Sequence, residues 1–326
     1  MALENVLVTA PPRPSASIYR DLLGDRCQLQ FLTELDGAER SRALAAADIL
    51  ICGHVRNELT AGEAAQLRRV RFIQLLHSGA DHIPFSMLPR VPIACSRGKS
   101  AVEMAEHVAA LALACSRRIA LEDRKMRAGQ FDTYAAGPRV LAGGRCAILG
   151  FGGAGQAAAK IFRGLGMAID AINRSGKTDQ TVDFIGTVAD LQQVLCRSDL
   201  IVITMALTSA SAGLIGAREL GWMKDDAILV NVSRADLIDE SSLYERLRRQ
   251  PRFSAGLDVW WIEPFRHGEF RTDHPFLELD NLVASPHNSA QAANSDLGLA
   301  QTLRHVSAVL AGQAPRMLVD EDEKFL

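Results

Sequence analysis

Three polar residues in the second half of the 326-residue chain could together do acid–base chemistry on a small carboxylic acid. Arg234, Glu263 and His287 each come shortly after a short β-rich run. An arginine guanidinium can bind a carboxylate through two parallel hydrogen bonds, and a histidine can deliver a proton to a carbonyl oxygen. A glutamate nearby would hold that histidine in its charged, proton-donating form. Hydride reduction of a 2-oxo acid requires these residue types.

Each of these residues has an ordinary structural interpretation when it is taken alone. Arginine after a strand is commonly a surface charge, glutamate before a proline is typical of a turn, and histidine after a proline is common in polar loops. The catalytic hypothesis rests on their combination, because the parallel strands of one sheet bring their carboxyl ends to a single edge. We therefore predict Arg234, Glu263 and His287 as the catalytic residues.

A glycine-rich turn lies between the apolar run 146–149 and a helical pattern over 156–165. The turn contains Gly150, Phe151, Gly152, Gly153, Ala154 and Gly155. In a dinucleotide-binding fold the first glycine permits a tight turn, the second lets the backbone approach a pyrophosphate, and the third lets the helix pack against the strand. The N–H groups that begin the helix would then bind the phosphates. Such turns also serve packing alone, but the strand–turn–helix order predicts a dinucleotide site.

The residues after the next strand bear on which dinucleotide would bind. Asn173 stands 23 residues after Gly150, near the position where an acidic side chain usually binds the adenosine ribose of NAD. Here the chain reads Asn173, Arg174 and Ser175, and Arg174 could bind a 2′-phosphate that an acidic group would repel. Asp170 comes two residues too early and should point into the packing of the strand. We predict NADP as the preferred cofactor and NAD as the alternative, against the ordinary interpretation of Arg174 as a solvated loop arginine.

Short apolar runs alternate with helical patterns along the chain, and runs that are apolar throughout are typical of strands buried on both faces of a parallel sheet. A long alanine-rich helix is predicted over 100–127, ended by a glycine- and proline-rich stretch at 135–144, and a last helix over 290–311. Strands are predicted at 6–9, 29–32, 48–52, 71–76 and 92–95, and in a second series at 146–149, 168–172, 200–204, 227–232, 255–259 and 282–285. Two such series predict two α/β domains, each with a doubly wound parallel sheet.

The composition excludes several classes of protein. Hydrophobic residues make up 48% and charged residues 23%, as expected for a folded globular chain of two domains. The formal net charge of −2 offers no basic field for nucleic acid. No apolar run approaches the roughly 20 residues of a membrane span, and the first residues lack a secretory signal. The six cysteines are scattered without a Cys-x-x-Cys pair, so we expect no metal site, no disulfide framework and a cytoplasmic location.

The combined motifs resemble those of the D-isomer-specific 2-hydroxyacid dehydrogenases, and the resemblance covers nearly the whole chain. The other motifs that carry it, besides the glycine-rich turn, are Ser78-Gly79-Ala80-Asp81, Ala105-Glu106-His107, Asn231-Val232-Ser233-Arg234, Gly256-Leu257-Asp258-Val259, Glu263-Pro264 and Pro286-His287. No single motif is specific, but the set is. The resemblance implies a Rossmann cofactor domain inserted in a flavodoxin-like substrate domain.

The resemblance implies a catalytic or substrate-binding role for five residues. Arg234 would bind the substrate carboxylate and keto oxygen. His287 would be the acid/base and would contact the substrate, and Glu263 would tune it. The backbone amides of Ser78 and Gly79 would hold the carboxylate from the other domain.

The same resemblance implies further cofactor contacts and a subunit interface. Besides the glycine-rich turn and residues 173–175, the expected cofactor contacts are Met205, Val232, Arg234, Asp258 and His287. Asp258 would lie near the nicotinamide carboxamide. His107 lies in the middle of a helix, and we expect a packing or subunit-interface role for it. A homodimer built on the helix around residues 101–117 is also implied.

The resemblance places the domain boundaries away from the middle of the chain. Residues 1–101 and 287–326 would form a discontinuous substrate domain, and residues 102–286 would form the dinucleotide-binding domain. The chain would cross twice between them, which suits a cleft that closes on its substrate and excludes water from hydride transfer.

Several positions depart from the family pattern. Ala206 stands where a proline is common, and Ala235 stands where a glycine is common after the arginine. Glu263 and His287 are 24 residues apart, more than the family spacing, and residues 265–272 resemble an inserted loop. Two adjacent tryptophans, Trp260-Trp261, precede the glutamate. These departures bear on the choice of substrate rather than on the chemistry.

The sequence therefore predicts an NADPH-dependent reductase of small 2-oxo acids, with glyoxylate or hydroxypyruvate favoured and no nucleic-acid or membrane partner. One alternative is a cofactor-binding sensor or co-repressor that keeps the fold, although a pure binder has no need of a proton donor. A second alternative is a dehydrogenase of formate or phosphite, whose substrates need a smaller site than two adjacent tryptophans suggest.

Overall fold

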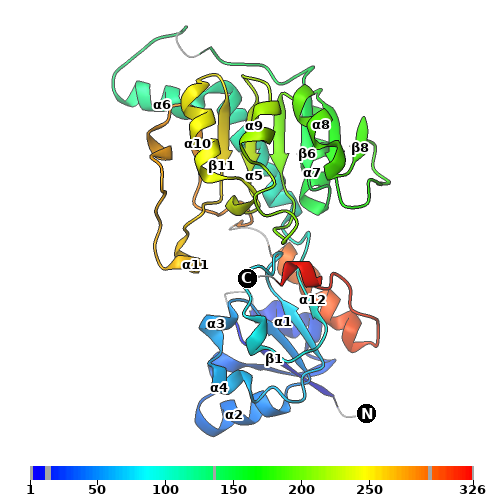
Figure 1. Cartoon of the computed structure of the whole chain (residues 1–326). Helices are drawn as coiled ribbons and strands as arrows, with labels where there is room; N and C mark the ends of the chain where they lie inside the picture. The colour runs from blue at the N-terminus through cyan, green and yellow to red at the C-terminus, as the bar shows by residue number, and fades with distance from the viewer. Residues whose placement is uncertain (1–2, 12–15, 135–136, 293–295, 325–326) are drawn as a thin grey trace. The chain divides into compact units, whose positions relative to one another are not determined.

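The computed structural model describes residues 3–11, 16–134, 137–292 and 296–324, and these form two compact units. The smaller unit consists of Met1–Lys99 and Ala293–Leu326, and the larger unit consists of Ser100–Ala292. Each unit is built on its own parallel sheet (Figure 1). In chain order the larger unit is therefore an insertion within the smaller one. The functional assignment of residues 1–101 with 287–326, and of 102–286, stays a prediction.

The smaller unit contains a five-stranded sheet in which all neighbouring strands are parallel. The strand order β2-β1-β3-β4-β5 is the flavodoxin-like arrangement that the family resemblance implies. The strands are β1 (Glu4–Val8), β2 (Cys27–Phe31), β3 (Ile49–Cys52), β4 (Phe72–Leu75) and β5 (Ile93–Ala94). Every residue of β3 and β4 is buried, as expected for strands that are covered on both faces.

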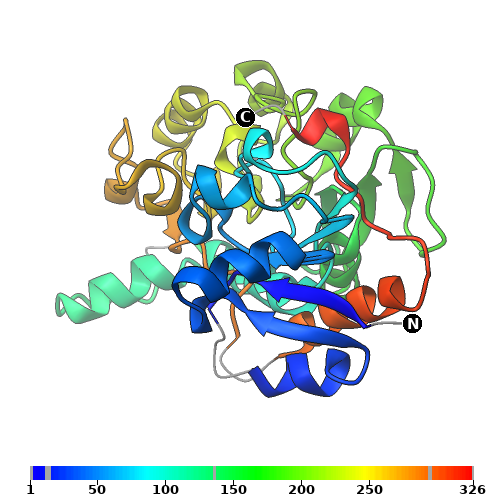
Figure 2. The same ribbon diagram turned by 90° about the horizontal axis from the view of Figure 1, so that it is seen from below.

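Helices cover both faces of this smaller sheet. On one face α1 (Ala16–Leu23) and α12 (Leu297–Leu310), from opposite ends of the chain, lie side by side (Figure 2). The predicted last helix, 290–311, is thus observed as α12, while residues 293–295 of its predicted span lie outside the described residues. The opposite face packs against α2 (Gly37–Ala46) and α3 (Val55–Glu58), and α4 (Ala61–Ala64) contacts α2. The 3₁₀ helices of this unit are η1 (Leu32–Glu34), η2 (Phe85–Met87) and η6 (Glu321–Glu323).

The larger unit contains a seven-stranded parallel sheet in the order β12-β11-β10-β9-β6-β7-β8. The strand order reverses between β6 and β9, and such reversal points are where open α/β sheets bind ligands. The strands are β6 (Arg145–Leu149), β7 (Ala168–Ile172), β8 (Phe184–Gly186), β9 (Leu200–Ile203), β10 (Ile228–Asn231), β11 (Ser254–Leu257) and β12 (Leu282–Ala284). The sequence predicts all of these strands except β8.

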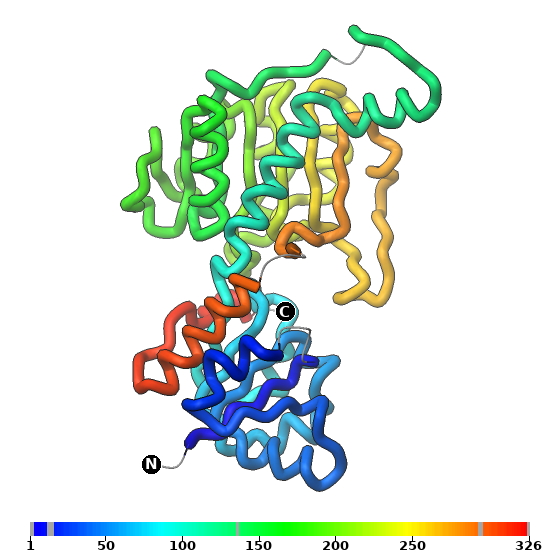
Figure 3. Tube along the Cα trace, turned by 180° about the vertical axis from the view of Figure 1, so that it is seen from behind, coloured from blue at the N-terminus to red at the C-terminus, as the bar shows by residue number. Residues whose placement is uncertain are grey.

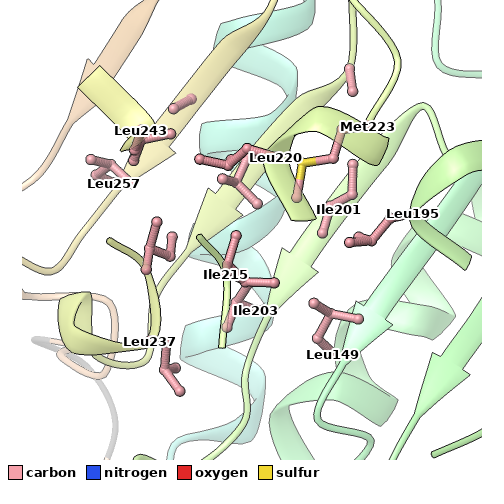
Figure 4. Packing of buried hydrophobic residues seen from close by; sticks show 14 of the residues in the cluster. Leu149, Leu195, Ile201, Ile203, Ile215, Leu220, Met223, Leu237, Leu243 and Leu257 are labelled. Carbon is pink, nitrogen blue, oxygen red and sulfur yellow. The ribbon is translucent and has the colours of Figure 1, made fainter. Parts of the chain in front are cut away.

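Two hydrophobic layers enclose the larger sheet. On one face α5 (Ala101–Arg117) runs along α7 (Gly153–Gly164), as Figure 3 shows. The other face packs against α8 (Leu191–Arg197), α9 (Ala217–Trp222) and α10 (Glu240–Arg249), and Figure 4 shows the side chains that meet there. The remaining short elements are α11 (Pro264–His267), η3 (Val188–Asp190), η4 (Ala235–Leu237) and η5 (Phe276–Glu278).

The prediction of one long helix over 100–127 is wrong, because the helix is interrupted at Arg118. This residue has φ 55°, in the left-handed region, and it separates α5 from α6 (Ile119–Arg127). Arginine is a good helix former, so its residue type gives no signal of the break. Figures 1 and 2 show α6 at the periphery of the larger unit. Among the described residues, no helix has the length and apolar character needed to cross a membrane.

Candidate functional site

The glycine-rich turn between β6 and α7 has the geometry that the sequence predicts. Gly150 has φ 102°, and an ideal Cβ there would lie 2.4 Å from the backbone nitrogen of Met205. A Cβ at Gly155 would lie 2.3 Å from the carbonyl oxygen of Gly150, so the helix could not pack as closely on the strand. Both positions therefore require glycine. Met205 follows β9, so this contact joins the two strands that flank the reversal of strand order.

The beginning of α7 fits a bound pyrophosphate. Gly152 is the residue before the helix, and a Cβ added to it would meet no atom within 4 Å. Gly153 and Ala154 open the helix, whose first turn contains no acidic residue and whose start has no side-chain cap. Free N–H groups and the positive end of the helix dipole would favour a phosphate here. The predicted cofactor residues of this turn are therefore consistent with a dinucleotide.

The loop after β7 is held by the side chain of Asn173. Its Oδ1 accepts a hydrogen bond from the N–H of Gly176 at 2.7 Å, and its Nδ2 donates to the carbonyl of Lys177 at 2.8 Å. Arg174 and Ser175 are exposed at the outer side of this loop. Asn173 thus shapes the turn on which Arg174 is exposed.

Asp170 points into the packing, as the sequence predicts. It is fully buried within β7, and its two carboxylate oxygens accept from Arg145 at 2.7 Å and from Arg197 at 2.6 Å. Because both oxygens are engaged by arginines, this carboxylate is not the acidic ribose-binding group of an NAD site.

The turn after β10 positions Arg234 through the side chain of Asn231. The Nδ2 of Asn231 donates to the carbonyl of Arg234 at 2.8 Å, and its Oδ1 accepts from the N–H of Ser233 at 3.0 Å. Val232 is buried, and the Nη1 of Arg234 donates to the carbonyl of Ser233 at 2.7 Å. A buried amide therefore fixes the backbone from which the half-buried Arg234 side chain projects.

Glu263 and His287, which the sequence predicts as catalytic partners, are in direct contact. The Nδ1 of His287 lies 2.8 Å from the Oε1 of Glu263. The same oxygen accepts from the N–H of Trp260 at 2.9 Å, and Glu263 is only 3% exposed. The ring of Phe265 packs edge-on against the imidazole, with 5.2 Å between ring centroids. A buried carboxylate thus fixes the orientation of the imidazole ring.

Asp258 holds the segment that carries His287. Its Oδ1 accepts from the hydroxyl of Ser285 at 2.6 Å and from the N–H of Asn288 at 3.0 Å, and its Oδ2 accepts from the N–H of Ser289 at 2.9 Å. The carboxylate is fully buried. A contact between Asp258 and the nicotinamide carboxamide stays a prediction.

His107 takes part in the same network, which the sequence does not reveal. Its Nε2 lies 2.8 Å from the Oγ of Ser285 and 3.5 Å from the Oδ1 of Asp258. His107 and Ser285 are 178 residues apart, and no spacing rule links them. Together they extend the set of side chains behind His287.

The unusual residues around Glu263 serve packing. The indole N–H of Trp260 donates to the carbonyl of Ser285 at 3.0 Å, and that of Trp261 donates to the carbonyl of Ile238 at 2.9 Å. The loop 265–272 contains part of α11, and Phe270 packs edge-on against Trp260. Trp260 therefore anchors this loop, and both tryptophans hold the turn that carries the carboxylate of Glu263.

Ser78 and Gly79, the predicted substrate contacts, belong to the smaller unit, whereas the other predicted site residues belong to the larger unit. They follow β4, and the hydroxyl of Ser78 donates to the carbonyl of Ser96 at 3.1 Å. His287 also belongs to the larger unit, although the predicted boundary assigns it to the substrate domain.

Comparison with known proteins assigns the chain to a family. The sequence model for the NAD-binding domain of D-isomer specific 2-hydroxyacid dehydrogenases matches residues 109–289. A hydroxypyruvate reductase from Thermotoga maritima is 30% identical over 278 residues, covering 84% of this chain and 88% of the relative. A glyoxylate reductase from Thermococcus litoralis is 33% identical over 221 residues, 65% of each chain.

A solved structure agrees with this assignment at the level of the fold. The D-isomer specific 2-hydroxyacid dehydrogenase from Xanthobacter autotrophicus Py2, determined in complex with NADPH and MES, matches with a TM-score of 0.79 at 21% identity. The match covers 98% of each chain. The chain is therefore a member of the D-isomer-specific 2-hydroxyacid dehydrogenase family, an oxidoreductase with a Rossmann-like domain for a nicotinamide dinucleotide.

Proposed function

We propose that this dehydrogenase reduces a small 2-oxo acid, glyoxylate or hydroxypyruvate, with NADPH as the hydride donor. The observation that carries the proposal is the 2.8 Å contact between His287 and the buried carboxylate of Glu263. Such a pair supplies a proton donor in a fixed orientation. The names of the two relatives, a hydroxypyruvate reductase and a glyoxylate reductase, support the substrate class.

The proposed reaction adds one hydride and one proton to the keto group. The bound nicotinamide supplies the hydride that the keto carbon accepts. The Nδ1 of His287 is engaged by Glu263, so its Nε2 delivers the proton to the keto oxygen. Arg234 binds the substrate carboxylate and polarises the carbonyl, with the backbone amides of Ser78 and Gly79 as further contacts. The product is the 2-hydroxy acid, and Glu263 stabilises the imidazolium from which the proton leaves.

Initial rates across a panel of substrates test this assignment. We expect NADPH oxidation with glyoxylate and hydroxypyruvate to exceed that with pyruvate and with bulkier 2-oxo acids. Tight NADPH binding with no 2-oxo acid accepted would instead support a sensor or co-repressor. Reduction of NADP by formate or phosphite, without 2-oxo acid reduction, would support the second alternative.

The preference for NADPH is proposed from the exposed Arg174 and from the absence of an acidic ribose ligand at Asn173. A charge-assisted hydrogen bond contributes about 1.5–3 kcal/mol, so Arg174→Asp should raise the KM for NADPH roughly 10- to 100-fold. The KM for NADH should change little. Lys177→Asp, in the same exposed loop, is the matched control for the added negative charge. A variant Arg174→Asp that keeps its NADPH preference would remove this part of the proposal.

A homodimer is also part of the proposal. Large apolar side chains are exposed on α6 and the loop after it: Ile119, Met126, Phe131 and Tyr134. Exposed apolar patches of this kind mark interaction surfaces, and they adjoin the alanine-rich α5. The proposed compartment is the cytoplasm, because all six cysteines are free thiols and all but Cys196 are buried.

A further inference from the structure

Three histidines lie near one another at the carboxyl end of the smaller sheet, on the loops that follow the neighbouring strands β3 and β4. Cys52 of β3 and Leu75 of β4 are register partners. His54 comes two residues after the first and His77 two residues after the second, so the two imidazoles leave the sheet side by side. His82 follows on the same loop as His77. This end of a parallel sheet is where α/β folds build ligand sites.

The three rings have the mutual spacing of imidazoles around one metal ion. The ring centroids lie 4.5 Å apart for His54 and His77, 5.0 Å for His77 and His82, and 5.7 Å for His54 and His82. One ring nitrogen of each residue lies within 4.8 Å of the others. Imidazoles bound to a tetrahedral zinc ion, with Zn–N of about 2.0–2.1 Å, have centroids roughly 5 Å apart. A small closing movement of the side chains would complete the coordination.

The backbone that carries His54 is held by hydrogen bonds to Glu58. Glu58 accepts hydrogen bonds from the N–H of Gly53 at 3.0 Å, the N–H of His54 at 2.7 Å and the hydroxyl of Thr9 at 2.6 Å. A Cβ at Gly53 would lie 2.9 Å from the Glu58 carboxylate and 3.5 Å from the Nε2 of His77. Glycine there lets the turn and the imidazole approach each other. The ligands therefore start from a rigid scaffold, which lowers the entropic cost of binding.

We propose that His54, His77 and His82 bind one divalent transition-metal ion of the zinc class. Neutral imidazole is a preferred ligand of zinc, copper and nickel, and three protein ligands leave a fourth tetrahedral position for water. All three side chains are half-buried. A bound ion would tie the loop 77–82, which contains Ser78 and Gly79, to the end of β3.

The expectation of no metal site, drawn from the scattered cysteines, gives no weight to histidine. The sequence does contain a signal, His77-x4-His82 with His54 upstream, but only the pairing of β3 with β4 brings the third residue close.

Calorimetric titration of the chelator-treated full-length chain with zinc sulfate tests the site without substrate or cofactor. We expect one ion per chain. His54→Gln and His82→Gln should each weaken binding by more than about 100-fold, because losing outer-shell partners alone costs about 10- to 100-fold. His274→Gln, which removes a half-buried histidine of the larger unit, is the control and should keep the affinity.

X-ray absorption at the zinc edge on the wild-type chain decides the matter even if a variant fails to fold. The expected first shell contains three imidazole nitrogens and one or two light atoms. No saturable binding, fewer than three imidazoles, sulfur ligands, or unchanged affinity in both folded variants would each overturn the proposal. None of these readouts measures turnover, so their failure would leave the proposed reductase reaction untouched.

Discussion

His287 lies in the left-handed region of backbone conformation, at φ 54°, where residues other than glycine are uncommon. Such strain persists only where the surroundings fix it, and here the buried Asp258 accepts both following N–H groups, those of Asn288 and Ser289. Residues of the larger unit thereby present the imidazole to Glu263. His287, which we propose as the proton donor, is therefore held in place by residues outside its Pro286-His287 motif.

Replacing the proposed catalytic carboxylate, Glu263, by its amide tests the effect of the charge separately from that of the shape. Glu263→Gln can still accept from Trp260 and His287, so the fold should remain intact. Loss of the negative charge removes about 1.5–3 kcal/mol of stabilisation of the His287 imidazolium by the carboxylate. We therefore expect kcat to fall roughly 10- to 100-fold. Steady-state kinetics with thermal unfolding measure both effects, and Glu245→Gln, on the surface of α10, is the control. Unchanged kcat in a folded Glu263→Gln protein would show that the charge has no catalytic role.

Two glycines of the same turn should respond differently to one added methyl group. Gly150→Ala places a Cβ 2.4 Å from the Met205 nitrogen in a left-handed backbone, so the free energy of unfolding should fall by about 1–3 kcal/mol or more. Gly152→Ala meets no atom within 4 Å and should leave stability unchanged, yet weaken NADPH binding at least about tenfold by blocking the pyrophosphate. Urea unfolding and fluorescence titration measure the two quantities. Normal NADPH affinity in Gly152→Ala would place the phosphates elsewhere.

At this scale the sequence predicts the groups that would do chemistry but not the groups that hold them. Arg234, Glu263 and His287 follow strands, so their convergence can be foreseen from a parallel sheet. The contact between Ser285 and His107 cannot be foreseen, because it joins the loop after β12 to the middle of α5, 178 residues away in the sequence. Only packed structure shows that contact.

The helices and strands follow the buried apolar runs, which is why eleven of the twelve strands in the described part of the chain can be predicted from sequence. The missed strand, β8 (Phe184–Gly186), is three residues long and lies at the edge of the sheet, so it lacks a continuous apolar run. The break at Arg118 is missed for another reason. Arg118 ends α5 in the left-handed region although arginine has a high helix propensity, so its residue type does not indicate the break.

Helix α12 is joined to the smaller sheet by a histidine that must stay neutral. The Nδ1 of His305 lies 2.7 Å from the Oε1 of the buried Gln74, and its Nε2 accepts from the N–H of Arg316 at 2.9 Å. Burial, followed by the positive charge of Arg316, lowers the pKa of His305 below its ordinary value of 6.5. Protonation would remove the acceptor that the Arg316 N–H uses.

This contact makes the stability of the chain depend on pH. Between the lowered folded pKa and about 6.5 the unfolded His305 binds a proton that the folded one does not, so stability should fall as the pH drops through this window. The slope should stay below about 1.4 kcal/mol per pH unit, because solvent screens a half-exposed ring. Urea unfolding at pH 7.5 and 5.5 measures it, with His305→Gln expected to lose less stability on acidification. An equal loss in both proteins would contradict this account.

At the scale of the whole molecule, the chain order is more informative than the length. A length of 326 residues and two series of strands predict two domains, but only the resemblance to the dehydrogenase family implies that one is inserted in the other. The two units are the observed counterpart, with Ser100–Ala292 inserted between Lys99 and Ala293. The sequence composition does not mark the point where the chain passes from the smaller unit to the larger one, since α5 begins at Ala101, directly after Lys99 and Ser100.

The proposed dimer predicts a measurable mass in solution. Light scattering coupled to size exclusion should give twice the chain mass of 35.3 kDa. The double substitution of Ile119 and Met126 by lysine, on the exposed side of α6, should give the single-chain mass, because charges replace apolar contacts. Val188→Lys alters an equally exposed apolar residue away from α6 and should leave the dimer intact. A wild-type chain of single mass would contradict the proposed assembly.

Single-turnover hydride transfer from saturating NADPH to glyoxylate, followed by the loss of NADPH absorbance, tests the central claim most directly. The claim is that His287, oriented by Glu263, gives the proton that completes 2-oxo acid reduction. The account predicts that His287→Ala slows this step roughly 10²- to 10⁴-fold while NADPH remains bound. A His287→Ala protein that transfers hydride at a near-normal rate, with glyoxylate or any other 2-oxo acid, would contradict it.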